Sequence, residues 1–280
     1  MIQIKIANGF KLAAIDLDGT LLGTDHEISV ANARAVRQLQ LAGAQVVLAS
    51  GRHYNSMHKY ANALPGVQWV VSCQGGEISD VRRKTVLGRV FLSTEEANQA
   101  LELGRSLGFT PVVYKVDGVF TNASWNGEMA FFTDLAGHRP AVLSAEKLLT
   151  QEVFKVIWMG EPERITGVGL PLSQLPASVQ IVRTHERILE FMSASVSKGS
   201  ALATLAANLG IDRSEAVVFG DGENDIPMFE WAGTSVAMPH GWDAAIIRAT
   251  WIAPNGPEET ALARGVEMVF ANRGITLGLV

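Results

Sequence analysis

Two aspartates that follow an apolar run could hold a divalent cation beside a phosphate group. Asp16 and Asp18 come directly after the run 12–15, which predicts a buried strand. Side chains alternate along an extended chain, so two carboxylates two residues apart point the same way. Gly19 follows at once and allows the backbone to turn sharply. Carboxylate oxygens suit Mg²⁺, and Mg²⁺ makes attack by one anion on another feasible. The stretch 16–20 therefore predicts phosphate chemistry.

Other polar residues stand at the ends of predicted strands or at the start of a predicted helix. Ser50 follows the apolar run 45–49, and Lys198 begins an alanine-rich helix. The segment Gly-Asp-Gly-Glu-Asn-Asp at 220–225 ends the apolar run 216–219. Ligands of open parallel sheets bind outside the carboxyl ends of the strands. We therefore expect these side chains to meet at one place.

The elements that must position them alternate between strand and helix at both ends of the chain. The first 80 residues predict strands at 12–15, 45–49 and 68–72 and helices at 29–42 and 54–64. After residue 192 the pattern predicts helices at 198–208, 225–231, 242–249 and 258–270 and strands at 216–219, 234–237 and 251–253. Such alternation is typical of an α/β fold with a parallel sheet and right-handed crossovers. We expect a Rossmann-like, three-layer core.

The middle of the chain has a different pattern. The turn signal Asp117-Gly118 separates two apolar runs and predicts a β-hairpin. A helix is expected at 94–107, and further strands at 110–115, 119–121, 154–159, 180–183 and 187–192. Hairpins imply an antiparallel sheet, so we expect an inserted α+β domain. The predicted core is residues 1–83 and 189–280, and the predicted insertion is residues 84–188.

Composition excludes several classes of function. The chain has 280 residues and a net charge of −5, which gives no electrostatic footprint for nucleic acid or anionic lipid. No run of about 18 apolar residues predicts a membrane span, and residues 1–10 do not have the pattern of a signal peptide. Cys73 is the only cysteine, so no internal disulfide can form. We expect a cytoplasmic protein.

The chain resembles the haloacid dehalogenase-like hydrolases, in particular the Cof-like phosphatases of subclass IIB. The family's motifs occur in order: Asp-x-Asp-Gly-Thr at 16–20, a hydroxyl at Ser50, Lys198, and Gly-Asp-x-x-Asn-Asp at 220–225. A lone Asp-x-Asp is common in loops, so the specificity comes from joint agreement in type, order and strand-end placement. The inserted segment matches the α/β cap of this subclass, and the resemblance spans nearly the whole chain.

The resemblance implies catalytic roles for Asp16, Asp18, Ser50 and Lys198. Asp16 is expected to attack the phosphorus and form an aspartyl-phosphate. Asp18 is expected to protonate the leaving oxygen and then to deprotonate the hydrolytic water. Ser50 and Gly51 would bind the phosphoryl group, and Lys198 would neutralise charge between the nucleophile and the phosphate.

The resemblance also implies a Mg²⁺ site and its surroundings. Its ligands would be Asp16, the backbone carbonyl of Asp18, and Asp221. Asp225 would orient Lys198 or a metal-bound water, and Asn224 would contact the phosphoryl group.

Two loops depart from the family's usual sequence. Where Asn-Gly-Ala is common, this chain has Gln74-Gly75-Gly76, so substrate contacts there are expected to differ. Where Gly-Asn-Ala is common, it has Pro239-His240-Gly241. His240 is either a structural residue of that loop or a substrate contact, and we expect the structural role.

The predicted function is Mg²⁺-dependent hydrolysis of a small phosphomonoester, a sugar phosphate or related metabolite, under a closing cap. The subclass also contains phosphosugar mutases, so a mutase is an alternative, as is a non-catalytic phosphometabolite sensor or scaffold. The expected partner is a small phosphorylated metabolite, with no nucleic acid and no membrane. No motif in 84–188 names the substrate, and none in the chain names an oligomeric state.

Overall fold

The computed structural model describes residues 9–148 and 152–276 and divides into two compact units. The first unit comprises Met1–Gly51, Met57–Gly88 and Ser197–Val280, and the second comprises Arg52–Ser56 and Arg89–Val196. Of the segment 1–10, in which no signal peptide is expected, residues 1–8 lie outside the described part. Within the described ranges, no helix is both long and apolar enough to cross a membrane.

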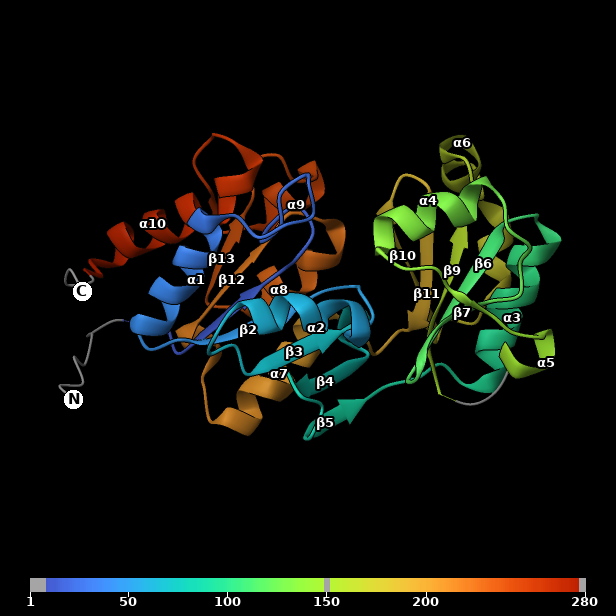
Figure 1. Ribbon diagram of the computed structural model, residues 1–280, viewed down its shortest axis with the longest axis horizontal. Coiled ribbons are helices and arrows are strands. Elements are labelled where there is room, and N and C mark those ends of the chain that lie inside the picture. Colours follow the sequence, from blue (N-terminus) through green and yellow to red (C-terminus); the bar gives the residue numbers. More distant parts are fainter. Residues whose placement is uncertain (1–8, 149–151, 277–280) are drawn as a thin grey trace. The chain divides into compact units, whose positions relative to one another are not determined.

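The first unit is built on an eight-stranded sheet with the order β14-β13-β12-β1-β2-β3-β4-β5 (Figure 1). Neighbouring strands are parallel from β14 to β3, whereas β4 runs antiparallel to β3. The strands are β1 (Leu12–Ile15), β2 (Gln45–Ala49), β3 (Trp69–Ser72), β4 (Glu77–Asp80), β5 (Val86–Arg89), β12 (Ala216–Gly220), β13 (Thr234–Ala237) and β14 (Trp251–Ile252).

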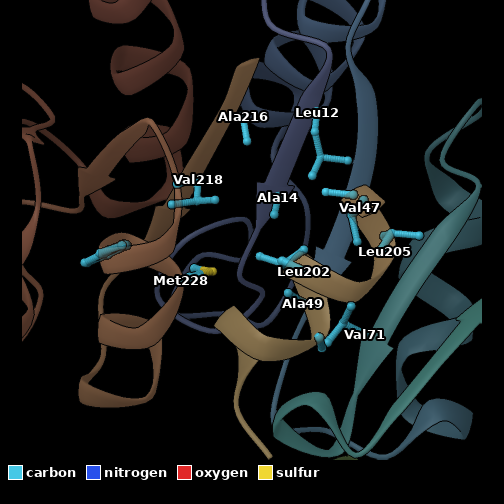
Figure 2. Close-up of a cluster of buried hydrophobic side chains, with 14 of the residues drawn as sticks. Leu12, Ala14, Val47, Ala49, Val71, Leu202, Leu205, Ala216, Val218 and Met228 are labelled. Atoms are coloured by element: carbon cyan, nitrogen blue, oxygen red, sulfur yellow. The ribbon is translucent and has the colours of Figure 1, made fainter. Parts of the chain in front are cut away.

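Helices cover both faces of this sheet, which is why its central strands are apolar on both sides. One apolar core lies between the sheet and helices α7 and α8, with Ala14 and Val218 of the strands packed near Leu202 and Met228 (Figure 2). On the other face α10 reaches the sheet at Gly265 and packs on α1. The helices are α1 (Val30–Leu41), α2 (Tyr54–Ala63), α7 (Lys198–Leu209), α8 (Ile226–Trp231), α9 (Asp243–Arg248) and α10 (Ala261–Arg273), with 3₁₀ turns η1 (Cys73–Gly75), η3 (Arg213–Glu215), η4 (Glu223–Asp225) and η5 (Glu258–Thr260). The predicted three-layer α/β core is confirmed.

The second unit contains a six-stranded sheet with the order β10-β11-β9-β6-β7-β8. Its pairs are antiparallel except β7 with β8, which helix α4 connects. Sequence patterns indicated neither α4 nor β8. The elements are β6 (Thr110–Lys115), β7 (Gly118–Thr121), β8 (Ala141–Val142), β9 (Val153–Met159), β10 (Val179–His185), β11 (Ile188–Ser193), α3 (Thr94–Ser106), α4 (Gly127–Ala136), α5 (Ala145–Leu148), α6 (Pro162–Thr166) and η2 (Leu170–Gln174).

The chain crosses between the units at positions that strand pairing explains. The crossings predicted from the sequence lie at 83/84 and 188/189, whereas the units change at 88/89 and 196/197, and the short segment Arg52–Ser56 also belongs to the second unit. Strands β4 and β5 extend the sheet of the first unit, and β11 pairs with β9 and β10 in the second. Apart from Arg89, the last residue of β5, these strands therefore remain in the unit whose sheet satisfies their backbone hydrogen bonds.

Replacing Gly104 by Ala is expected to destabilise the second unit by about 2–4 kcal/mol, because the added methyl overlaps a buried indole. A Cβ at Gly104 would lie 2.6 Å from Cε2 of Trp158, whose Nε1 donates a hydrogen bond to the Ala100 carbonyl at 2.8 Å. Chemical denaturation measures the loss. Gly127→Ala is the matched control, since a Cβ there meets nothing within 4 Å; equal effects of both changes would contradict the account.

Candidate active site

Three neighbouring strands end together at one edge of the first unit's sheet. Ile15 of β1 pairs with Leu48 of β2 on one side and with Phe219 of β12 on the other. The amide of Asp16 continues this ladder by donating to the Phe219 carbonyl at 3.0 Å. The parallel register thus brings to one edge the polar residues that follow these strands, namely Asp16, Ser50 and Asp221.

A buried lysine joins two of the predicted acidic residues. Ser197 caps helix α7 through a reciprocal capping box with Ser200, so Lys198 occupies the first helical position. Lys198 is fully buried, and its Nζ lies 2.5 Å from Oδ1 of Asp16 and 2.6 Å from Oδ1 of Asp225. The ammonium therefore balances two carboxylates, one directly after β1 and one in the turn that follows β12.

Asp225 is held on both of its carboxylate oxygens. Oδ1 accepts from Lys198, and Oδ2 accepts from the backbone amides of Asp221 at 2.9 Å and Gly222 at 3.0 Å. The side chain packs so closely on Gly220 that a Cβ there would lie 2.5 Å from its Cγ. These bonds fix the loop after β12 and place Asp225 as a support for Lys198.

A cluster of carboxylates in this edge fits a divalent cation. Asp16, Asp221 and Asp225 each offer an oxygen, and these oxygens lie within 4.8 Å of one another. Thr20 Oγ1 donates to Oδ1 of Asp221 at 3.2 Å. Gly19 has a φ of +75°, and a Cβ there would lie 2.5 Å from Oδ2 of Asp221, so the turn needs glycine. Hard oxygen donors in this number suit Mg²⁺ or a similar ion.

Burial and the neighbouring charges shift the pKa values of the clustered groups. Burial raises the pKa of the Asp16 carboxyl well above its usual range, and the acidic neighbours add to this, although Lys198 opposes it. Burial and the nearby Asp225 raise the pKa of Asp221 to about 7. Burial lowers the pKa of Lys198, but the carboxylates of Asp16 and Asp225 outweigh it and raise that pKa overall. An added positive charge would relieve the repulsion.

The Asp18 carboxylate has a different environment from that of Asp16. Its side chain is 41% exposed, and its Oδ1 lies 3.7 Å from Nδ1 of His26. Among the described residues it is not one of the three clustered carboxylates. The two aspartates of one motif are therefore distinct: Asp16 is buried against Lys198, and Asp18 is open to a proton donor or acceptor outside.

The predicted phosphate-contacting residues are linked through a residue whose role was not predicted. Ser50 is buried, and its backbone carbonyl accepts from the backbone amide of Gln74 at 3.1 Å. Gln74 Oε1 accepts from Nδ2 of Asn224 at 3.1 Å, and the Gln74 side chain packs against Gly51. The only sequence signal was the departure from the family pattern at this loop.

His240 makes a structural contact in the second departing loop. Its Nε2 donates to the Gly19 carbonyl at 2.7 Å, and Gly241 packs directly on the backbone of Asp221. This loop thereby supports the turns that carry Asp18 and Asp221.

Comparisons with known proteins agree with this geometry. The family model of the haloacid dehalogenase-like hydrolases matches residues 13–265. The chain is 26% identical over 238 residues to the putative phosphatase YxeH of Bacillus subtilis, covering 82% of this chain and 87% of that one. It is 26% identical over 249 residues to the 5-amino-6-(5-phospho-D-ribitylamino)uracil phosphatase YcsE of the same species, covering 89% and 92%.

A solved structure shares the fold. A haloacid dehalogenase-like hydrolase from Bacteroides thetaiotaomicron superposes with a TM-score of 0.80 at 27% identity, over 93% of this chain and all of that one. With the strand-end motifs brought together as described, the chain belongs to the haloacid dehalogenase-like hydrolase family, as one of its phosphatases.

Proposed function

We propose that this protein hydrolyses a small phosphomonoester, a sugar phosphate or related metabolite, with Mg²⁺ and through an aspartyl-phosphate on Asp16. The observation that carries the proposal is the buried Asp16 carboxylate, 2.5 Å from the Lys198 ammonium and within the carboxylate cluster. The named activity of the relative YcsE, a phosphatase of a small phosphorylated metabolite, supports the substrate class.

In the first proposed step, an oxygen of Asp16 attacks the phosphorus and the ester bond to the leaving oxygen breaks. Asp18 donates its proton to that leaving oxygen, which departs as an alcohol. The exposed position of the Asp18 carboxylate suits this exchange, because protons can reach it from outside the buried cluster.

In the second step, Asp18 takes a proton from a water molecule whose oxygen attacks the phosphorus of the aspartyl-phosphate. The bond between phosphorus and Asp16 breaks, which releases orthophosphate and restores the carboxylate. Microscopic reversibility gives Asp18 the role of acid in one step and base in the next.

The remaining residues bind and orient the phosphoryl group. Lys198 offsets negative charge between the nucleophile and the phosphoryl oxygens, and Ser50, Gly51 and Asn224 contact those oxygens. Positioning and charge stabilisation dominate phosphoryl transfer, and the buried contacts of Lys198 hold it in place before substrate arrives.

The donor set suits a hard divalent cation. We assign its ligands to Asp16, the backbone carbonyl of Asp18, and Asp221, with Asp225 orienting Lys198. When bound, such a cation supplies positive charge that lowers the repulsion between a carboxylate and the phosphoryl oxygens. The raised pKa values of Asp16 and Asp221 fit a site that takes a positive charge.

The second unit, residues 84–188 in the prediction from sequence, is proposed as a cap that excludes water and selects the leaving group. A lid of this kind favours small substrates over protein chains. We place the enzyme in the cytoplasm, on the ground that Cys73 is its only cysteine and the substrate is a small metabolite.

Stabilisation by Mg²⁺ is expected to increase as pH rises. The pKa of Asp221 is raised to about 7 and that of Asp16 is also raised. Between pH about 4 and pH about 7 the metal-free folded protein holds more protons than the unfolded chain, so its stability falls as pH rises through that window. Mg²⁺ requires the deprotonated carboxylates and gains affinity over the same range.

Thermal unfolding with and without saturating Mg²⁺ measures this effect. The rise in Tm caused by Mg²⁺ should be small at pH about 5.5 and several-fold larger at pH about 8. Asp221→Asn should remove most of the difference between the two pH values. A rise in Tm that does not depend on pH would contradict the assignment of these carboxylates to the cation.

A panel of small phosphomonoesters tests the function itself. The purified protein with Mg²⁺ should release orthophosphate from at least one group of related metabolites, and chelation by EDTA should stop the release. Isomerisation of a sugar phosphate without release of orthophosphate would instead identify a mutase. No turnover across the panel would contradict the proposal.

A further inference from the structure

The loop that follows β3 adopts an unusual backbone. Cys73 and Gln74 have φ values of +53° and +63°, and Gly75 follows with +107°. Consecutive non-glycine residues in the left-handed region are uncommon and cost conformational energy. Surrounding contacts must therefore hold this loop, and such strain is often found at functional sites.

The contacts of the loop reach two catalytic segments. The backbone amide of Gln74 donates to the Ser50 carbonyl at 3.1 Å, and a Cβ on Gly51 would overlap the side-chain Nε2 of Gln74. A Cβ on Gly75 would overlap the carbonyl of Ser197, which caps the helix that begins with Lys198. The loop is thus packed tightly against the serine segment and the lysine helix.

The side chain of Gln74 reaches a third segment. It is buried, and its Oε1 accepts from Nδ2 of Asn224 at 3.1 Å. The other end of the Asn224 amide, Oδ1, packs on Gly222, where a Cβ would overlap it. Asn224 is therefore clamped between Gln74 and Gly222. Because an amide nitrogen carries two hydrogens, one remains to donate elsewhere.

We propose that Gln74 is a positioning residue, whose side chain orients the Asn224 amide toward the phosphoryl group, while its backbone amide holds the Ser50 carbonyl. The inference rests on the proposed function, because it takes Asn224 as a contact of the phosphoryl oxygens. Gln74 takes part in no bond that forms or breaks in the proposed steps. It fixes the rotamer of Asn224 before substrate binds, so the Asn224 side chain need not be ordered during the reaction.

A double-mutant cycle on Gln74 and Asn224 tests this role, with 4-nitrophenyl phosphate and a set of alkyl phosphates as substrates. Gln74→Met keeps the length of the side chain but removes the acceptor. It should lower kcat/KM by about tenfold. That is the loss expected when one hydrogen bond is removed and the Asn224 side chain is no longer held in one rotamer. The loss should be equal for all substrates, because the phosphoryl group is common to them.

The coupling between the two residues is the decisive readout. Asn224→Ala alone should lower kcat/KM by about 100-fold, as removal of one fixed donor does. In that background Gln74→Met should cost less than about twofold, since the residue it positions is gone. A further tenfold loss in the Asn224→Ala background would overturn the proposal, as would wild-type kcat/KM in Gln74→Met.

Two further variants separate positioning from folding. Gln74→Asn tolerates the left-handed backbone better than most residues but is one methylene shorter, so it should retain the wild-type Tm and still lose activity. Gln40→Met is the matched control: Gln40 is another glutamine that donates to a loop carbonyl, that of Pro65, at 3.0 Å, and packs on a glycine, Gly66. It should keep wild-type kcat/KM.

The same measurements distinguish failure of this inference from failure of the proposed function. A wild-type protein that releases no phosphate, and whose Tm orthovanadate does not raise, would overturn both. An active wild-type protein with additive losses in the cycle would overturn only the role of Gln74.

Discussion

Replacement of Asp16 by Asn is expected to lower kcat by about 10⁴-fold or more, the loss typical of removing a nucleophile. An amide oxygen does not attack phosphorus under these conditions, whereas the amide is nearly isosteric with the carboxylate. The substitution therefore removes the proposed chemistry and leaves the shape of the site unchanged. Phosphate release under saturating substrate and Mg²⁺ measures it.

The same variant should unfold at the same temperature as the wild type or at a higher one. The pKa of Asp16 is raised by burial and by neighbouring acids, so the ionised carboxylate costs stability at neutral pH in the metal-free protein. Asparagine carries no charge and removes that cost. Asp243→Asn, in an exposed position of α9, is the control and should change neither activity nor Tm. Full activity in Asp16→Asn would show that the nucleophile lies elsewhere.

Replacement of Lys198 by Met is expected to reduce both activity and stability. Its Nζ balances Asp16 and Asp225 at 2.5 and 2.6 Å with no exposure to solvent. Loss of one partner from a buried ion pair costs about 3–5 kcal/mol, because the remaining charge is left buried and unpaired. Loss of charge stabilisation at the phosphoryl group should lower kcat/KM by about 10³-fold as well.

The pH dependence of the Lys198→Met variant follows from its unpaired carboxylates. The raised pKa of Lys198 keeps its ammonium charged throughout the neutral range, so the wild type retains this stabilisation by Lys198 there. In the variant, protonation at low pH neutralises the buried acids, so its deficit in Tm should shrink as pH falls. Lys11→Met is the matched control: Lys11 pairs with Glu215 at 2.6 Å on the surface, and because solvent screens such pairs its loss should change Tm little. A comparable loss of Tm in both variants would contradict the account.

The sequence predicted that Asp16, Ser50 and Asp221 would lie at one edge of the sheet, because each follows an apolar run that forms a strand. The apolar runs before Asp16, Ser50 and Asp221 form β1, β2 and β12, and α1 forms within the predicted helix 29–42. Parallel pairing follows from the strand-helix alternation, and it brings these strand ends together without any further information. The cluster with Lys198 then results from a helix that starts beside that edge.

Contacts that depend on backbone detail could not be predicted. The bond between Gln74 and Asn224 joins residues 150 positions apart, and it requires a left-handed loop that no pattern indicated. Both oxygens of Asp225 are occupied because the loop after β12 turns its amides toward that carboxylate. The raised pKa of Asp221 depends on burial and neighbours rather than on residue type.

In the second unit, the sequence patterns that indicate helices and strands were weaker than in the first, and two elements were missed. The hairpin at Asp117-Gly118 was predicted from its turn residues, and strands β6 and β7 do pair there. Helix α4 has apolar residues around much of its circumference, and β8 has only two residues, both exposed. Neither has the periodicity by which an element is recognised.

Trapping of the phosphorylated enzyme tests the central claim most directly. In Asp18→Asn, 4-nitrophenyl phosphate should still phosphorylate the enzyme, because nitrophenolate needs no proton to leave, but hydrolysis of the intermediate should be slow for lack of a base. Acid quenching and peptide mass spectrometry should then find one phosphoryl group on Asp16, and none when Asp16 is also replaced by Asn. A phosphoryl group on another residue, or a burst of nitrophenol with no phosphorylated peptide, would contradict the assignment of Asp16 as the nucleophile.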